Sequence, residues 1–304
     1  GMQNTERSLH HLEKIIAFAA LAAVFALAIG FAQAAEPKRP AEKSDQVFLR
    51  SAVALVQDAA SGETLYAKNQ GAVLPIASIT KLMTAIVILD AGLNLEQRVA
   101  ISDEDYDLVK GTRSRLRPGT VLTRDELLLL ALMSSENRAA ASLGRTYPGG
   151  SDAFVAAMNA KARALGMSDT RFVDPTGLSS ANVSTAHDLA RLVAAAHEYP
   201  LIGQYSTRES ATVQALGRPL GYRNTNGLVR SAHWDIGLSK TGYISEAGRC
   251  LVMRVRMASR EVNVVLLDSW GKFSRVGDVL EHGLGHAPLR HLAQVFDAGD
   301  DRHE

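Results

Sequence analysis

The order of strand-forming and helix-forming segments constrains the fold of this chain more than any other feature. Residues 47–69 read as two β-rich runs around a turn at 60–62, and three further strand-like runs follow late in the chain. Helical patterns fill the middle. This order predicts an α+β unit in which one antiparallel sheet takes its strands from both ends of the chain and encloses an inserted helical region. The late strands are expected at 234–238, 250–257 and 262–268, and helices at 78–91, 123–133, 152–165, 186–197 and 273–284.

Composition supports one globular domain. The 304 residues are 46% hydrophobic, which is enough to fill a sizeable core, and no repeat or linker interrupts residues 48–284. We therefore assign 48–284 to the domain and 285–304 to a C-terminal tail. The net charge of +1 gives no reason to expect a nucleic-acid partner. The single cysteine, Cys250, cannot form an intramolecular disulfide and is expected in the core.

The N-terminal segment has the order of a secretory signal. Arg7 and Lys14 precede an apolar run over 15–32, which ends in Ala32-Gln33-Ala34. A charged start, an apolar middle and a small-residue site predict a signal peptide over 1–34, followed by a flexible leader over 35–47. An uncleaved membrane anchor is the alternative, because about 18 apolar residues nearly span a bilayer. Either way the domain is expected outside the cytoplasm.

The run PIASITKLMTA contains Ser78 and Lys81, three residues apart. If a helix begins there, both side chains project from one face and can meet. A serine hydroxyl needs an adjacent base to act as a nucleophile, and a lysine is a base only when its pKa is lowered. The apolar neighbours of Lys81 favour such a lowering, and a second nearby cation would add to it. An ordinary helix cap with a surface lysine explains the same two residues.

Two further motifs decide between these readings. MSSENRAA places Ser135 and Asn137 in a short loop between two helical segments, and WDIGLSKTGY places the tripeptide Lys240-Thr241-Gly242 at the end of a β-rich run. There Gly242 would let a ligand approach closely. S-x-x-K, S-x-N and K-T-G in this order are the motif set of class A β-lactamases and penicillin-binding proteins. Together they predict that Ser78 is catalytic.

With these motifs the chain resembles the low-molecular-mass penicillin-binding proteins, the family of D-alanyl-D-alanine carboxypeptidases and endopeptidases, over roughly 48–272. Segments such as SSENRAAASLGRTYPGG and DPTGLSSANVST are most similar to its periplasmic endopeptidase branch. The resemblance implies a β-lactamase/transpeptidase-like fold and a serine DD-peptidase in the periplasm. By the same resemblance, the enzyme is expected to hydrolyse D-Ala cross-links between peptidoglycan peptide stems. β-Lactams are expected as covalent inhibitors, and the membrane or cell-wall enzymes as loosely associated partners.

The resemblance also implies roles for individual residues. Ser78 attacks the D-Ala carbonyl, Lys81 is the general base and Ser135 relays a proton. Asn137, Lys240, Thr241, Gly242 and Tyr243 bind the substrate, and the backbone N–H groups of Ser78 and Tyr243 form the oxyanion hole. No cofactor is expected, since the nine histidines show no metal-binding spacing.

Three other functions are alternatives for this chain. A β-lactamase of class A needs E-x-x-L-N between the second and third motifs, but Glu198 to Leu201 is followed by Ile202. A carboxypeptidase would trim terminal D-Ala. Carboxypeptidase relatives usually carry a second domain, yet fewer than 40 residues follow Leu267. These relatives also tend to have an arginine where this chain has Thr225. Arg223 or Arg230 could replace that arginine, so this alternative stays open. A non-catalytic wall-binding protein would not require the Ser–Lys pair.

One basic stretch departs from the even charge balance. It contains Lys110, Arg113, Arg115 and Arg117. We interpret it as a solvated loop rather than a binding strip.

Overall fold

The computed structural model describes residues 51–257 and 259–269. The predicted signal peptide, the leader, the helix at 273–284 and the tail lie outside these residues.

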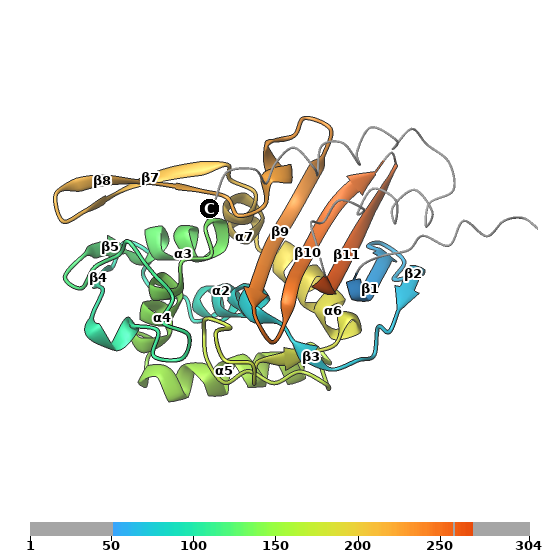
Figure 1. The fold of residues 1–304 in the computed structure, drawn as a ribbon, viewed down its shortest axis with the longest axis horizontal. Coiled ribbons are helices and arrows are strands. Elements are labelled where there is room, and N and C mark those ends of the chain that lie inside the picture. The colour runs from blue at the N-terminus through green and yellow to red at the C-terminus, as the bar shows by residue number, and fades with distance from the viewer. Residues whose placement is uncertain (1–50, 258, 270–304) are drawn as a thin grey trace, which may run out of the picture. The chain divides into compact units, whose positions relative to one another are not determined.

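One five-stranded antiparallel sheet joins the two ends of the described chain (Figure 1). Its order is β2-β1-β11-β10-β9, so the first strand pairs with the last, with Leu55 opposite Val265. This confirms the predicted fold class. β9 forms one edge of the sheet. The bounds are β1 Ser51–Asp58, β2 Thr64–Lys68, β9 Asp235–Ile244, β10 Gly248–Met257 and β11 Arg260–Ser269.

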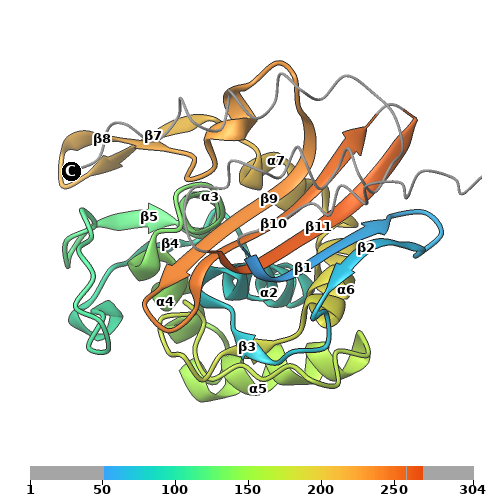
Figure 2. The ribbon, with the colours of Figure 1, turned by 45° about the vertical axis from the view of Figure 1, so that its right-hand side comes forward.

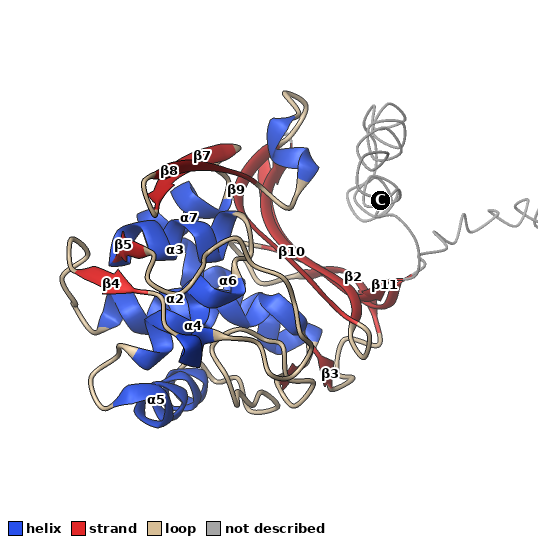
Figure 3. Cartoon of the chain, turned by 60° about the vertical axis from the view of Figure 1, so that its left-hand side comes forward, coloured by secondary structure: helices blue, strands red, loops and turns tan. Residues whose placement is uncertain are grey.

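The α-helices gather on one face of this sheet (Figure 3). The first of them starts as a single 3-10 turn, η1 Ala77–Ile79, and continues as α2 Thr80–Asp90. Residues all round α2 are buried, as its apolar sequence predicts. Around it lie α3 Arg124–Met133, α4 Asn137–Arg145, α5 Gly150–Ala164, α6 Ala186–His197 and α7 Pro200–Ser206.

Both faces of the sheet are apolar. Val53 and Leu55 belong to the large core shared with the helices, whereas Ala54 and Val56 belong to a second cluster that includes Trp234. This division follows the two-residue period of a strand. Cys250 is fully buried in the main core, as predicted.

A two-stranded hairpin that the sequence did not predict extends beside α3 (Figures 1 and 2). It consists of β7 Ser210–Ala215 and β8 Arg218–Arg223. Pro219 and Gly221 lie within β8, and both residues weaken a strand pattern in sequence. The remaining short elements are β3 Leu74–Pro75 paired with β6 Val183–Ser184, β4 Arg98–Ala100 paired with β5 Val121–Thr123, η2 Asp103–Asp105 and η3 Gly227–Arg230.

Within the described residues, none of the helices combines the length and the apolar character that a membrane span requires.

Candidate active site

Ser78 and Lys81 meet at the start of the central helix. Ser78 lies in the 3-10 turn and Lys81 in the first turn of α2, which brings Lys81 Nζ to 2.7 Å from Ser78 Oγ. The side chain of Lys81 is completely buried, at 0% exposure. The predicted spacing therefore places a hydroxyl and a buried amine in hydrogen-bond contact.

Lys81 Nζ has two more partners, and their chemistry fixes the direction of proton transfer. It lies 2.7 Å from Asn137 Oδ1 and 2.8 Å from the carbonyl oxygen of Thr176. Both oxygens only accept hydrogen bonds. A neutral amine has two N–H groups and one lone pair, so the two N–H groups point to these oxygens. The lone pair is left to face the hydroxyl of Ser78.

The neutral form of the Lys81 amine is populated near neutral pH. Burial lowers the pKa of Lys81 from 10.5 to about 7, and the charges of Asp174 and Glu136 oppose that change. The lowering predicted from apolar neighbours thus has burial as its cause. The second predicted cation, Lys240, is 1% exposed, and its own pKa is lowered well below its ordinary value, first by burial and then by the charge of Lys81.

The loop before α4 supplies the second motif. Asn137 begins α4, and besides accepting from Lys81 it donates from Nδ2 to Thr112 Oγ1 at 3.2 Å. Glu136 caps the helix by accepting from the backbone N–H of Arg138 at 3.1 Å. Ser135 has a positive φ of 58°, a strained value for serine. Its hydroxyl forms no hydrogen bond with the described part of the chain, so its relay role stays a prediction.

Glu136→Gln should move the acid limb of the pH–rate profile to lower pH. The glutamine retains an oxygen that can accept from Ser114 and Arg138, but it removes a charge that raises the pKa of Lys81. A lower pKa leaves Lys81 neutral at more acidic pH. The measurement is kcat/KM against pH, with exposed Glu63→Gln as the matched control. An unchanged or basic-shifted limb would show that Lys81 does not set the profile.

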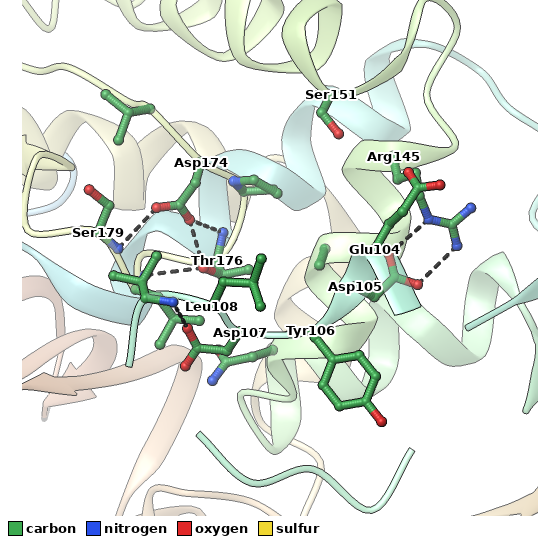
Figure 4. A pocket seen from close by; sticks show the side chains of 16 residues that line it. Glu104, Asp105, Tyr106, Asp107, Leu108, Arg145, Ser151, Asp174, Thr176 and Ser179 are labelled. Carbon is green, nitrogen blue, oxygen red and sulfur yellow. Dashed lines mark hydrogen bonds and ion pairs between the residues drawn. The ribbon is translucent and has the colours of Figure 1, made fainter. Parts of the chain in front are cut away.

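A loop to which the sequence analysis assigned no site residue, residues 174–179, completes the surroundings of Lys81. Asp174 accepts hydrogen bonds from the backbone N–H groups of Thr176 at 2.6 Å, Gly177 at 2.7 Å and Ser179 at 3.0 Å (Figure 4). These bonds hold the Thr176 carbonyl toward Lys81. The signal was present in D-P-T-G, because an aspartate commonly binds the backbone N–H groups that follow it in a turn.

The third motif lies inside β9 rather than at a strand end. Lys240 Nζ donates to the carbonyl oxygen of Thr241 at 2.9 Å, and Thr241 Oγ1 lies 2.6 Å from Thr225 Oγ1. Thr225 follows β8, so this contact joins the end of the hairpin to the edge strand of the sheet.

The glycine of this motif lets the strand approach the nucleophile's backbone. A Cβ at Gly242 would lie 2.9 Å from the backbone nitrogen of Ser78 and 3.1 Å from Ala77 Cβ. The sequence analysis expected a ligand to approach Gly242 here, but the neighbour is the start of η1. Tyr243 is next in the strand, and its side chain is 67% exposed. The two predicted oxyanion donors therefore belong to backbone segments in close contact.

Gly242→Ala should reduce acylation of Ser78 by about 10²-fold, the usual effect of losing one oxyanion donor. The added methyl group forces β9 away from η1 and misplaces the backbone N–H of Tyr243 relative to that of Ser78. Acylation by a chromogenic penicillin measures the effect. Gly71→Ala is the control, because a Cβ there meets nothing within 4 Å. Equal rates for both variants would exclude this role for Gly242.

A cavity of about 450 Å³ adjoins the site (Figure 4). Asn137 and Thr176, both partners of Lys81, contribute to its lining. The rest comes mainly from the acidic and apolar segment 104–109 and from 173–179.

Comparisons with known proteins agree with this geometry. The sequence profile of Peptidase S11, described as D-alanyl-D-alanine carboxypeptidase, matches residues 39–270. The chain is 51% identical over 255 residues to a D-alanyl-D-alanine endopeptidase of Pseudomonas aeruginosa. This alignment covers 83% of this chain and 82% of that protein. It is 47% identical to a D-alanyl-D-alanine endopeptidase of Escherichia coli, with the same coverage. The crystal structure of the Streptomyces K15 DD-transpeptidase superimposes with a TM-score of 0.72 at 26% identity, covering 78% of this chain and 98% of that chain.

The fold and the buried Ser–Lys pair define a serine-type peptidase that works through an acyl-enzyme. The chain belongs to the Peptidase S11 family of serine DD-peptidases, as its motifs predicted. Membership implies peptidoglycan peptides as substrates and penicillins as ligands.

Proposed function

We propose that this protein is a D-alanyl-D-alanine endopeptidase that hydrolyses cross-links between peptidoglycan stems through an acyl-enzyme on Ser78. The observation that carries the chemistry is the 2.7 Å contact between Ser78 Oγ and a buried lysine amine whose pKa is about 7. Two relatives at 51% and 47% identity bear the endopeptidase name, which supports the choice of substrate.

The reaction follows from the directions of the hydrogen bonds. Neutral Lys81 takes the proton of Ser78, and Oγ attacks the carbonyl carbon of the D-Ala residue. The backbone N–H groups of Ser78 and Tyr243 receive the developing negative charge. The C–N bond of the cross-link then breaks, and Lys81 returns the proton to the leaving amine, with Ser135 as the proposed relay. Water repeats the sequence on the ester and frees Ser78.

Thr225 supports an internal scissile bond. Its hydroxyl is paired with that of Thr241 at 2.6 Å, so a neutral group occupies the position where carboxypeptidase relatives tend to have arginine. A terminal carboxylate would find no cation at residue 225. Trimming of terminal D-Ala is the competing activity.

Product analysis separates the two activities. The mature protein is incubated with purified cross-linked muropeptide dimers and, separately, with monomeric pentapeptides. We expect dimers to become monomers. Loss of D-Ala from pentapeptides with the dimers intact would establish the carboxypeptidase instead, and rapid nitrocefin turnover would establish a β-lactamase.

We also propose that the protein works in the periplasm, loosely associated with the membrane or with other cell-wall enzymes. The support is the sequence pattern of residues 1–34. N-terminal sequencing of the exported protein tests it, with a start near Ala35 as the expected result. A start at the first residues of the chain would establish an uncleaved anchor.

A further inference from the structure

Two segments that are far apart in sequence form one cationic surface. Residues 108–123 and 210–223 contain no aspartate or glutamate. The second segment is the β7–β8 hairpin, which runs beside β5 in both ribbon views (Figures 1 and 2). Between them they carry Lys110, Arg113, Arg115, Arg117, Arg218 and Arg223.

Two of these cations hold the surface together. Arg115 donates from Nη2 to the carbonyl oxygen of Gly221 at 2.6 Å, and its guanidinium stacks 4.2 Å from the ring centre of Tyr222. Lys110 forms an ion pair with Glu246 in the turn between β9 and β10. The basic stretch is therefore not simply a solvated loop, as its sequence had suggested. Arg115 fixes it to the hairpin.

The other four cations are exposed and unpaired. Arg113, Arg117, Arg218 and Arg223 all have exposed side chains, and none of them has a carboxylate partner in the part of the chain that the structure describes. Asp107 and Glu209 directly precede the two segments in sequence. We call these four arginines the basic rim.

The basic rim reaches the catalytic motifs from two directions. Arg113 lies between Thr112, which accepts from Asn137 at 3.2 Å, and Ser114, which donates to Glu136 at 2.6 Å. Arg223 lies two residues before Thr225, whose hydroxyl contacts that of Thr241. An anionic group on the rim would thus lie on a surface continuous with the catalytic groups.

We propose that the basic rim binds carboxylates of the second peptide stem of a cross-linked substrate; this rests on the proposed endopeptidase function. Only one D-Ala carbonyl can occupy Ser78, so the other stem must lie on the adjoining surface. Exposed guanidinium groups suit carboxylates, which they bind through two parallel hydrogen bonds.

The test is a variant with Arg113→Gln, Arg117→Gln, Arg218→Gln and Arg223→Gln, assayed on muropeptide dimers at low salt. We expect KM to rise by about tenfold, since each exposed contact contributes modestly, while kcat changes little. Added salt should raise KM for the wild type and hardly affect the variant. For the wild type, dimers whose carboxylates are amidated should also have a higher KM than unmodified dimers. A control for loss of surface charge carries Arg163→Gln and Arg171→Gln, two exposed arginines outside both segments.

The outcomes are distinguishable. An unchanged KM and an unchanged salt dependence would overturn the proposal, and so would a wild type that is indifferent to amidation. If the variant lost only its binding to phosphatidylglycerol vesicles, the rim would be a membrane surface and the proposal would again be wrong. A wild type that is acylated by penicillin but leaves all dimers intact would instead refute the endopeptidase function. Penicillin acylation and circular dichroism of the variant verify its fold.

Discussion

Ser78→Ala is expected to abolish both peptide hydrolysis and covalent labelling by penicillin. The substitution removes the atom that forms the ester, and no other hydroxyl lies within hydrogen-bond distance of Lys81 Nζ among the described residues. Loss of a nucleophile lowers kcat by a factor on the order of 10⁴ to 10⁶. The fold should persist, because Ser78 Oγ bonds to no side chain other than Lys81 among the residues that the structure describes.

Intact-mass spectrometry after exposure to a penicillin gives a direct measurement. The wild type should gain the full mass of the penicillin, because the opened ring has no leaving fragment, and Ser78→Ala should gain nothing. Ser168→Ala replaces an exposed serine and should behave as the wild type. Stoichiometric labelling of Ser78→Ala would place the nucleophile elsewhere.

The sequence predicted those features of the site that depend on short spacing. Ser78 and Lys81 are one helical turn apart, so a helix start was sufficient to bring them together. The K-T-G and S-x-N motifs could be assigned to a strand and a loop by pattern alone. The same holds for the sheet, whose first and last strands are the most clearly patterned in the chain.

Contacts between distant segments could not be predicted in this way. The Thr176 carbonyl is 95 positions from Lys81, and a backbone oxygen leaves no mark on side-chain patterns. The basic stretch became informative only when Arg115 was seen on the hairpin, 106 positions away, at Gly221. The close approach at Gly242 likewise depends on how β9 packs against η1.

These distant contacts explain how one lysine can serve as a base. Burial lowers its pKa, while the two fixed acceptors, Asn137 and Thr176, determine where its protons point. Either property alone would be insufficient. A buried amine without fixed partners could turn its lone pair away from Ser78, and an exposed amine with the same partners would stay protonated at neutral pH.

Lys81→Met should therefore lower the acylation rate by about 10³-fold and also remove its pH dependence. In the wild type, Lys81 is protonated below pH 7 and has no lone pair, so kcat/KM should rise with pH through about 7 and then level off. Methionine fills similar space but accepts no proton from Ser78. The measurement is the rate of acylation by a chromogenic penicillin between pH 5 and pH 9. A variant that kept the limb near pH 7 would assign it to another group, and a variant with full rate would show that Ser78 needs no base at position 81.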